Sequence, residues 1–101
     1  MDQLKVIEAK QLRGAVISKL YMQYGVDIRI HALKNLLRSR GFIQDEDLQK
    51  TIFYLGGDGK RYIHVEVNKD EWRDSLIWLT PAGVNLAERD IQDIGVIFDD
   101  E

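Results

Sequence analysis

The sequence contains no cysteine, which excludes disulfides and thiolate metal sites and is compatible with a reducing compartment. Its only two histidines, His31 and His64, have no acidic residue or histidine three or four positions further along, the spacing of a helical metal pair. No apolar run approaches the roughly 20 residues of a membrane span, and residues 1–10 lack the apolar core and cleavage site of a signal peptide. We therefore expect a cytoplasmic protein that holds no metal or other cofactor and does not enter a membrane.

Linkers, repeats and low-complexity tracts are also missing, so residues 1–101 are expected to form a single domain. A domain of this size buries roughly 60 to 70% of the surface that its unfolded chain exposes, which is enough for a core without disulfides or metal. The segment GGDGK, residues 56–60, lacks the full GxxxxGK(S/T) spacing of a phosphate-binding loop and is interpreted as a helix stop. Hydroxyls and carboxylates are scattered, with no grouped nucleophile, base and orienting acid, and we expect no enzyme.

Charge is unevenly distributed along the chain, although the net charge is only −3. Residues 1–44 hold eight Lys/Arg and three Asp/Glu, giving +5, whereas residues 45–101 hold six and fourteen, giving −8. A field of this kind can orient a polyanion toward the first half, but an acidic protein has no general attraction for nucleic acid. Two solvated faces of mixed charge explain the same distribution.

The first predicted helix covers residues 4–24 and ends at Gly25. Apolar residues at approximately 3.6-residue spacing form its inward stripe: Ile7, Leu12, Ala15, Val16, Leu20 and Tyr21. Residues 1–11 form an N-terminal helical extension that is longer than a small three-helix core needs. Its apolar residues Leu4, Val6 and Ile7 predict a homodimer contact, with packing across their own domain as the alternative.

A second helix is predicted from the capping residue Asp27 to about Arg40, and Gly41 ends it. Its apolar residues are expected to face inward: Ile30, Leu33, Leu36 and Leu37. In the short turn that follows, Phe42 and Ile43 are apolar enough to fill the angle between this helix and the next.

A third helix is predicted to begin near Asp45 and to end at the glycines of residues 56–59. Its core stripe is Leu48, Ile52 and Leu55, at positions i, i+4 and i+7. This spacing leaves the opposite side of the helix exposed, with Glu46, Gln49, Lys50 and Phe53.

Alternation with a period of two predicts a strand after the glycines. Its two faces carry Ile63, Val65 and Val67 on one side and Tyr62, His64 and Glu66 on the other. The polar loop NKDEWRD joins it to a second strand at residues 76–79, which makes a hairpin. Thr80 as a cap and Pro81 in the first turn predict a last helix to about Asp90, and residues 92–101 are expected to form a flexible acidic tail.

Two stretches resemble the winged helix-turn-helix superfamily. DLQKTIFYLGGDGKRYI, residues 47–63, is similar to a recognition helix that leads through glycine into the wing, and LTPAGVNLAE, residues 79–88, is similar to the LTxxG entry to the last helix. The resemblance spans nearly the whole chain and implies an α+β fold with a three-helix core, a β-hairpin wing and a C-terminal helix.

A closer likeness is to small winged-helix proteins encoded in Mu-like prophages, in which the LTxxG segment is followed by a PGV-like tail. Here that tail reads Ile94, Gly95 and Val96, without the proline. The resemblance implies a DNA-binding transcriptional regulator of phage or prophage origin, with duplex DNA as its partner.

In winged-helix proteins the third helix reads base edges in the major groove, and the wing contacts phosphate or the minor groove. The resemblance therefore implies base-reading residues on the third helix and contacts at the wing tip: Gln44, Glu46, Gln49, Lys50 and Phe53, with Lys69 and Arg73. The best candidate phosphate-binding cations lie on the first two helices and at the base of the wing: Lys10, Arg13, Lys19, Arg29, Lys34, Arg38, Arg40, Lys60 and Arg61. A solvated basic face is the alternative interpretation.

The acidic start of the third helix is unusual for a DNA-reading helix, because Asp45, Glu46 and Asp47 repel phosphate. Negative charge at a helix N-terminus complements the free amides, and this explains Asp45 and Asp47 without any ligand. The acids also favour a second hypothesis, a winged-helix module that binds protein instead of DNA through Phe53 and Trp72, unless Trp72 folds back onto its own domain. A third hypothesis is that the acidic half mimics DNA for another protein.

Overall fold

Four α-helices and one three-stranded antiparallel sheet make up the fold in the computed structural model, which describes residues 2–99. Two short 3-10 helices, η1 and η2, accompany them. The elements follow the order α1 (Gln3–Met22), β1 (Ile28–Arg29), α2 (Ile30–Leu36), η1 (Arg38–Arg40), α3 (Asp45–Gly56), β2 (Ile63–Glu66), η2 (Trp72–Asp74), β3 (Leu76–Leu79) and α4 (Pro81–Ala87). The predicted α+β class is confirmed.

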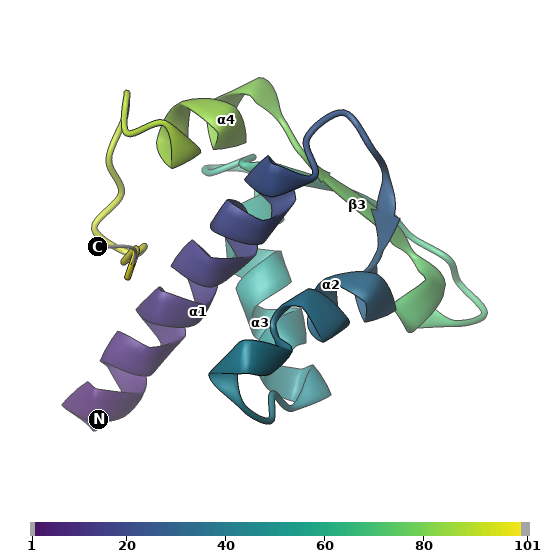
Figure 1. Ribbon diagram of the computed structural model, residues 1–101, viewed down its shortest axis with the longest axis horizontal. Helices are drawn as coiled ribbons and strands as arrows, with labels where there is room; N and C mark the ends of the chain where they lie inside the picture. Colours follow the sequence, from purple (N-terminus) through teal and green to yellow (C-terminus); the bar gives the residue numbers. More distant parts are fainter. Residues whose placement is uncertain (1, 100–101) are drawn as a thin grey trace.

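The longest helix, α1, crosses the molecule and packs against α2, α3, α4 and β3 (Figure 1). The residues that it buries lie in its second half: Gly14, Ala15, Val16, Ile17 and Leu20. The other helices and the sheet add side chains that are almost completely buried: Leu33, Leu37, Leu48, Leu55, Ile77, Leu79 and Leu86. One apolar core therefore joins the helices to the inner face of the sheet.

The sheet has the order β1-β3-β2, so β3 is its central strand. Ile28 pairs with Ile77 across β1 and β3, and Ile63 pairs with Leu79 across β2 and β3. Within β2 and β3 the predicted alternation holds, because Ile63, Ile77 and Leu79 are buried while the tilted rings of His64 and Trp78 lie together on the outer face, with centroids 4.7 Å apart.

Two residues of the predicted alternation behave differently. Val67 lies beyond the end of β2 and is 63% exposed. Tyr62 was expected beside His64 on the outer face but is buried, because it precedes the strand and follows Arg61, whose φ of 55° redirects the chain.

The predicted inward stripe of α1 is wrong at both ends. Ile7 is 44% exposed, and the buried part of α1 begins only at Gly14. Tyr21 is 39% exposed, and its hydroxyl donates a hydrogen bond to Glu88 at 2.6 Å. The predicted stop is correct, since the helix ends at Met22 and Gly25 has a φ of 93°, which only glycine adopts without strain.

The second helix is shorter than predicted, and Asp27 does not cap it. Residues 28–29 form β1 instead, and the amide of Ile30 donates to the carbonyl of Ser75, which ties the start of α2 to the hairpin. Leu36 is 38% exposed because α2 ends there and the chain tightens into η1. Phe42, predicted to fill the angle before α3, is 87% exposed, whereas Ile43 packs against the core.

The third helix has the predicted stripe. Leu48 and Leu55 are fully buried and Ile52 is 7% exposed. Thr51 is also buried, and its hydroxyl donates back to the carbonyl of Asp47. The opposite side of α3 is therefore turned outward, as the spacing predicted.

The last helix begins as predicted, at a Thr80 cap whose hydroxyl accepts from the amide of Gly83, and it ends at Ala87 instead of Asp90. Gly83 lies directly on the chain before β2. A Cβ atom there would come within 2.1 Å of the Tyr62 carbonyl oxygen, so only glycine fits. The LTxxG glycine thus allows α4 to pack onto the sheet.

The C-terminal segment, expected to be a flexible tail, instead packs along α1 (Figure 1). Val96 is 9% exposed, and the amide of Ile97 donates to the carbonyl of Lys10 at 3.1 Å. Gly14 makes this approach feasible, since a Cβ atom would lie 2.0 Å from the Ile97 carbonyl oxygen. Residues 100 and 101 of the predicted tail lie outside the described residues.

Candidate functional site

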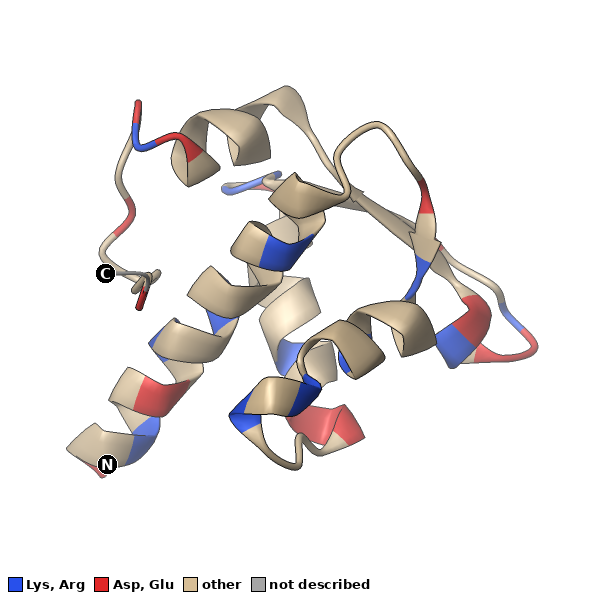
Figure 2. Cartoon of the chain, viewed as in Figure 1, with Lys and Arg blue, Asp and Glu red and all other residues tan. Residues whose placement is uncertain are grey.

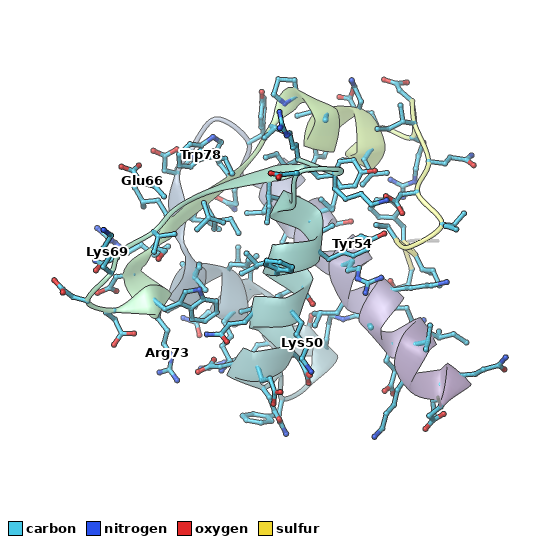
Figure 3. All side chains as sticks on the ribbon, turned by 180° about the vertical axis from the view of Figure 1, so that it is seen from behind. Lys50, Tyr54, Glu66, Lys69, Arg73 and Trp78 are labelled. Carbon is cyan, nitrogen blue, oxygen red and sulfur yellow. The ribbon has the colours of Figure 1, made fainter. Side chains whose placement is uncertain are left out.

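The side of α3 opposite its buried stripe carries four of the residues predicted to bind. Glu46, Gln49, Lys50 and Phe53 are all exposed, Phe53 by 82%. Lys50 pairs with Glu46 one turn earlier at 3.4 Å, and both side chains are about 70% exposed, so this pair contributes little to stability. In Figure 3, α3 is seen from its outer side, with Lys50 on the helix and Lys69 and Arg73 at the far end of the hairpin.

The first acid of α3, Asp45, is held by two cations from other elements. Lys34 of α2 donates to one carboxylate oxygen at 2.7 Å. Arg73 of η2 donates to the other oxygen through Nε, at 3.1 Å, and also through the guanidinium nitrogen Nη2. These hydrogen bonds, first from Lys34 and then from Arg73, lower the pKa of Asp45. One carboxylate thus faces two cations, and these three side chains together carry one net positive charge beside the negative charges of Glu46 and Asp47 in the same turn.

Three further predicted phosphate-binding cations also have partners within the chain. Arg40 of η1 pairs with Asp99 at 2.8 Å, and Lys60 pairs with Asp93 at 2.8 Å. Arg29 of β1 donates to the carbonyl of Asp74 at 2.8 Å. Figure 2 shows the resulting mixture of signs, with the basic 3-10 helix η1 next to the acidic first turn of α3.

Arg13 is turned inward, contrary to its predicted role in phosphate binding. Its guanidinium donates to the carbonyl of Gly95 at 2.9 Å and lies 3.9 Å from the centre of the Tyr54 ring. In contrast, Arg38, Arg61 and Lys69 are exposed and have no hydrogen bond or ion pair of their side chains within residues 2–99.

Sequence reasoning missed the most connected polar group, the carboxylate of Asp93, whose side chain is only 3% exposed. It accepts hydrogen bonds from the hydroxyls of Tyr54 at 3.0 Å and Tyr62 at 2.7 Å, and from the amide of Gly95 at 2.7 Å, beside its ion pair with Lys60. Burial alone would raise the pKa of Asp93, but the hydrogen bonds from Lys60 and Tyr62 outweigh it and hold the pKa below its ordinary value.

Tyr62 remains a proton donor to Asp93 at neutral pH. Its burial, together with the hydrogen bond to Asp93, raises the pKa of Tyr62 to about 12. Tyr54 points from α3 toward α1 and the C-terminal segment (Figure 3). Asp93 therefore joins the C-terminal segment to α3 and to the chain before β2, and no local sequence pattern indicates this.

The two residues of the predicted protein-binding pair, Phe53 and Trp72, differ in exposure. Trp72 is half-buried and packs against the core, so it folds back onto its own domain. Phe53 remains exposed, and Phe42, which the sequence placed inside, is exposed as well, with Lys34 Nζ 5.7 Å from its ring centre. The large aromatic side chains exposed at α3 are therefore two phenylalanines, one before the helix and one on it.

A shallow groove of about 440 Å³ lies on the outer face of the sheet, away from α3. Its walls come from the loop after α1 and from the outward residues of β2 and β3, and they include Tyr24, Asp27, His64, Trp78 and Pro81. The neighbouring aromatic rings of His64 and Trp78 line this groove.

Among residues 2–99, no group of three or more His, Asp or Glu side chains is placed to hold a metal ion. No helix in this described part of the chain is both long enough and apolar enough to cross a bilayer. The chain matches no protein-family model, no curated protein and no solved structure.

Proposed function

We propose that the protein is a small winged-helix DNA-binding regulator of phage or prophage origin, with a binding role and no catalytic one. The order of the elements supports this proposal, because β1 lies between α1 and α2 and joins the β2–β3 hairpin in one sheet, with α3 before the hairpin. In this arrangement α3 is the recognition helix and the loop between β2 and β3 is the wing.

The observation that carries the proposal is the open outer side of α3. Its core stripe is buried, and Gln49 and Lys50 on its other side are exposed in the part of the chain that the structure describes, so both can approach base edges in a major groove. Gln49 suits adenine, Lys50 suits guanine or phosphate, and Glu46 can accept from cytosine. The ion pairs of Asp45 with Lys34 and Arg73 support the same proposal, since they offset one of the three carboxylates that would repel DNA at this helix end.

The DNA proposal predicts salt-sensitive binding. We expect the chain to bind random duplex DNA at about 50 mM salt and to bind more weakly at about 200 mM, because each phosphate contact releases counterions. Arg38→Gln should weaken binding and reduce the slope of log affinity against log salt by about 0.9 for each copy of the chain that contacts the duplex, the value for one phosphate contact per copy. Fluorescence anisotropy with a labelled duplex measures both quantities.

Lys5→Gln is the matched control, since it removes the same charge from the exposed first turn of α1, far from α3 in the chain. It should leave the slope unchanged. Absence of detectable affinity at the lower salt concentration, where the phosphate contribution is largest, would remove the DNA-binding proposal.

The alternative function is a winged-helix module that binds protein and not DNA. The exposure of Phe53 by 82% and of Phe42 by 87% favours it, because each is a large apolar side chain in water that a protein partner could bury. A chain that folds normally but fails to bind duplex DNA at low salt would support this alternative.

A homodimer through α1 is a further part of the proposal. The first turns of α1 project beyond the core, with Leu4 62% and Ile7 44% exposed one turn apart, so they offer an apolar strip to a second copy. We expect sedimentation equilibrium to give twice the 11.7 kDa chain mass, and Leu4→Ser with Ile7→Ser to give the monomer. Ile94→Ser, at a residue that is 94% exposed elsewhere, should leave the dimer intact, and a monomeric wild type would contradict the prediction.

A further inference from the structure

The C-terminal segment continues beyond the residues that hold it against the core. After α4 it returns along α1, and residues 93–97 are fixed by the buried carboxylate of Asp93, by the hydrogen bond from Arg13 to Gly95, and by the hydrogen bond from Ile97 to Lys10. After residue 97, the acidic end of this segment reaches η1.

At that end, the carboxylate of Asp99 lies 2.8 Å from a guanidinium nitrogen of Arg40. Arg40 is the last residue of η1, five positions before α3 begins, and is one of the cations predicted to bind phosphate. The side chains are 28% and 42% exposed for Arg40 and Asp99, so a phosphate arriving from solvent can reach the same guanidinium.

We infer that Asp99 restrains DNA binding by occupying Arg40, in competition with a DNA phosphate. Carboxylate and phosphate bind the same guanidinium donors of arginine, so the two compete at the nitrogen that Asp99 holds. Because the anchors at Asp93 and Val96 hold Asp99 nearby, its effective concentration is far above that of a free acid. This regulation rests on the proposed DNA-binding function.

The other paired cations differ from Arg40 in how they can respond. Lys60 pairs with Asp93, whose side chain is 3% exposed and bound by two tyrosines, so this pair is an anchor and does not exchange freely with solvent. Asp45 lies within α3 itself and joins two elements to it. Among these three pairs, that of Arg40 with Asp99 is the one whose carboxylate can leave its cation without unpacking the core. The exposed pair of Glu46 with Lys50 lies within α3.

The test is a cycle of variants measured by anisotropy on a random duplex at about 50 mM salt. Asp99→Asn should tighten binding by about 1.5- to fivefold, the range for release of a partly exposed ion pair. Asp90→Asn is the matched control, because Asp90 is exposed and has no ion pair within residues 2–99, so it removes the same charge without freeing a cation. In the Arg40→Gln background, Asp99→Asn should tighten binding no more than Asp90→Asn does.

Equal effects of Asp99→Asn and Asp90→Asn in the wild-type background would overturn the inference and leave the DNA-binding proposal standing. A gain from Asp99→Asn that persists in the Arg40→Gln background would also overturn it, since the gain would then come from net charge. If the wild type and all variants fail to bind at low salt, the proposed function itself fails, and the inference fails with it.

Discussion

Replacing Asp93 with alanine is expected to lower the free energy of unfolding by about 3 kcal/mol. The substitution leaves the hydroxyls of Tyr54 and Tyr62 and the amide of Gly95 without their acceptor in a site where the carboxylate was 3% exposed. It also removes the partner of Lys60. Urea unfolding at pH 7, followed by tryptophan fluorescence, measures the change.

Asp90→Ala is the control for this effect, because Asp90 is exposed and should change stability by less than about 0.5 kcal/mol. The difference between wild type and Asp93→Ala should also depend on pH. Since the folded pKa of Asp93 is depressed below its ordinary value of 3.8, its stabilisation is complete above that pH and is lost as the pH falls toward the folded pKa. A difference that stays constant from pH 7 to pH 2 would contradict the assigned role.

Replacing Gly83 with alanine is expected to cost about 3 kcal/mol, near the upper end of the range for overpacking. The new Cβ atom would lie 2.1 Å from the Tyr62 carbonyl oxygen and 2.7 Å from Leu79 Cδ2. The carbonyl cannot move away easily, because it also accepts a hydrogen bond from the amide of Thr80 at 3.0 Å. This cost outweighs the gain of roughly 1 kcal/mol that alanine brings to a helix interior.

Gly59→Ala is the matched control for Gly83→Ala. A Cβ atom at Gly59 meets nothing within 4 Å, so its stability should remain within about 0.5 kcal/mol of wild type. Thermal and urea unfolding of the two variants under the same conditions make the comparison. Equal stability of Gly83→Ala and wild type would mean that α4 does not rest on the chain before β2.

Local patterns in the sequence predicted the features that depend on neighbouring residues. The buried stripe of α3, the Thr80 cap and the helix stop at Gly25 all follow from periodicity, a side-chain oxygen next to free amides, or a positive φ. The exposed residues of α3 follow from the same stripe. These interactions act within a few positions along the chain, so their residues can be read together.

Local sequence patterns did not predict the pairing of the charged groups. The sequence placed Lys34, Arg40 and Lys60 in water as candidate phosphate contacts, but each has an acidic partner: Asp45 for Lys34, Asp99 for Arg40 and Asp93 for Lys60. These partners are separated by 11 positions for Lys34 and by 59 for Arg40. Neither separation has a periodic or motif-like signature, so composition indicates the charges and not their pairing.

By itself, the sequence determined the α+β class, the order of the four helices, the span and core stripe of α3 and the side of that helix that faces water. Only the tertiary structure decided that residues 28–29 join the sheet, that Trp72 folds back, and that the C-terminal segment packs along α1. The physical reason is distance along the chain. Helix periodicity and capping act over three or four residues, whereas the carboxylate of Asp93 meets Tyr54 across 39 positions, and only folding brings such groups into contact.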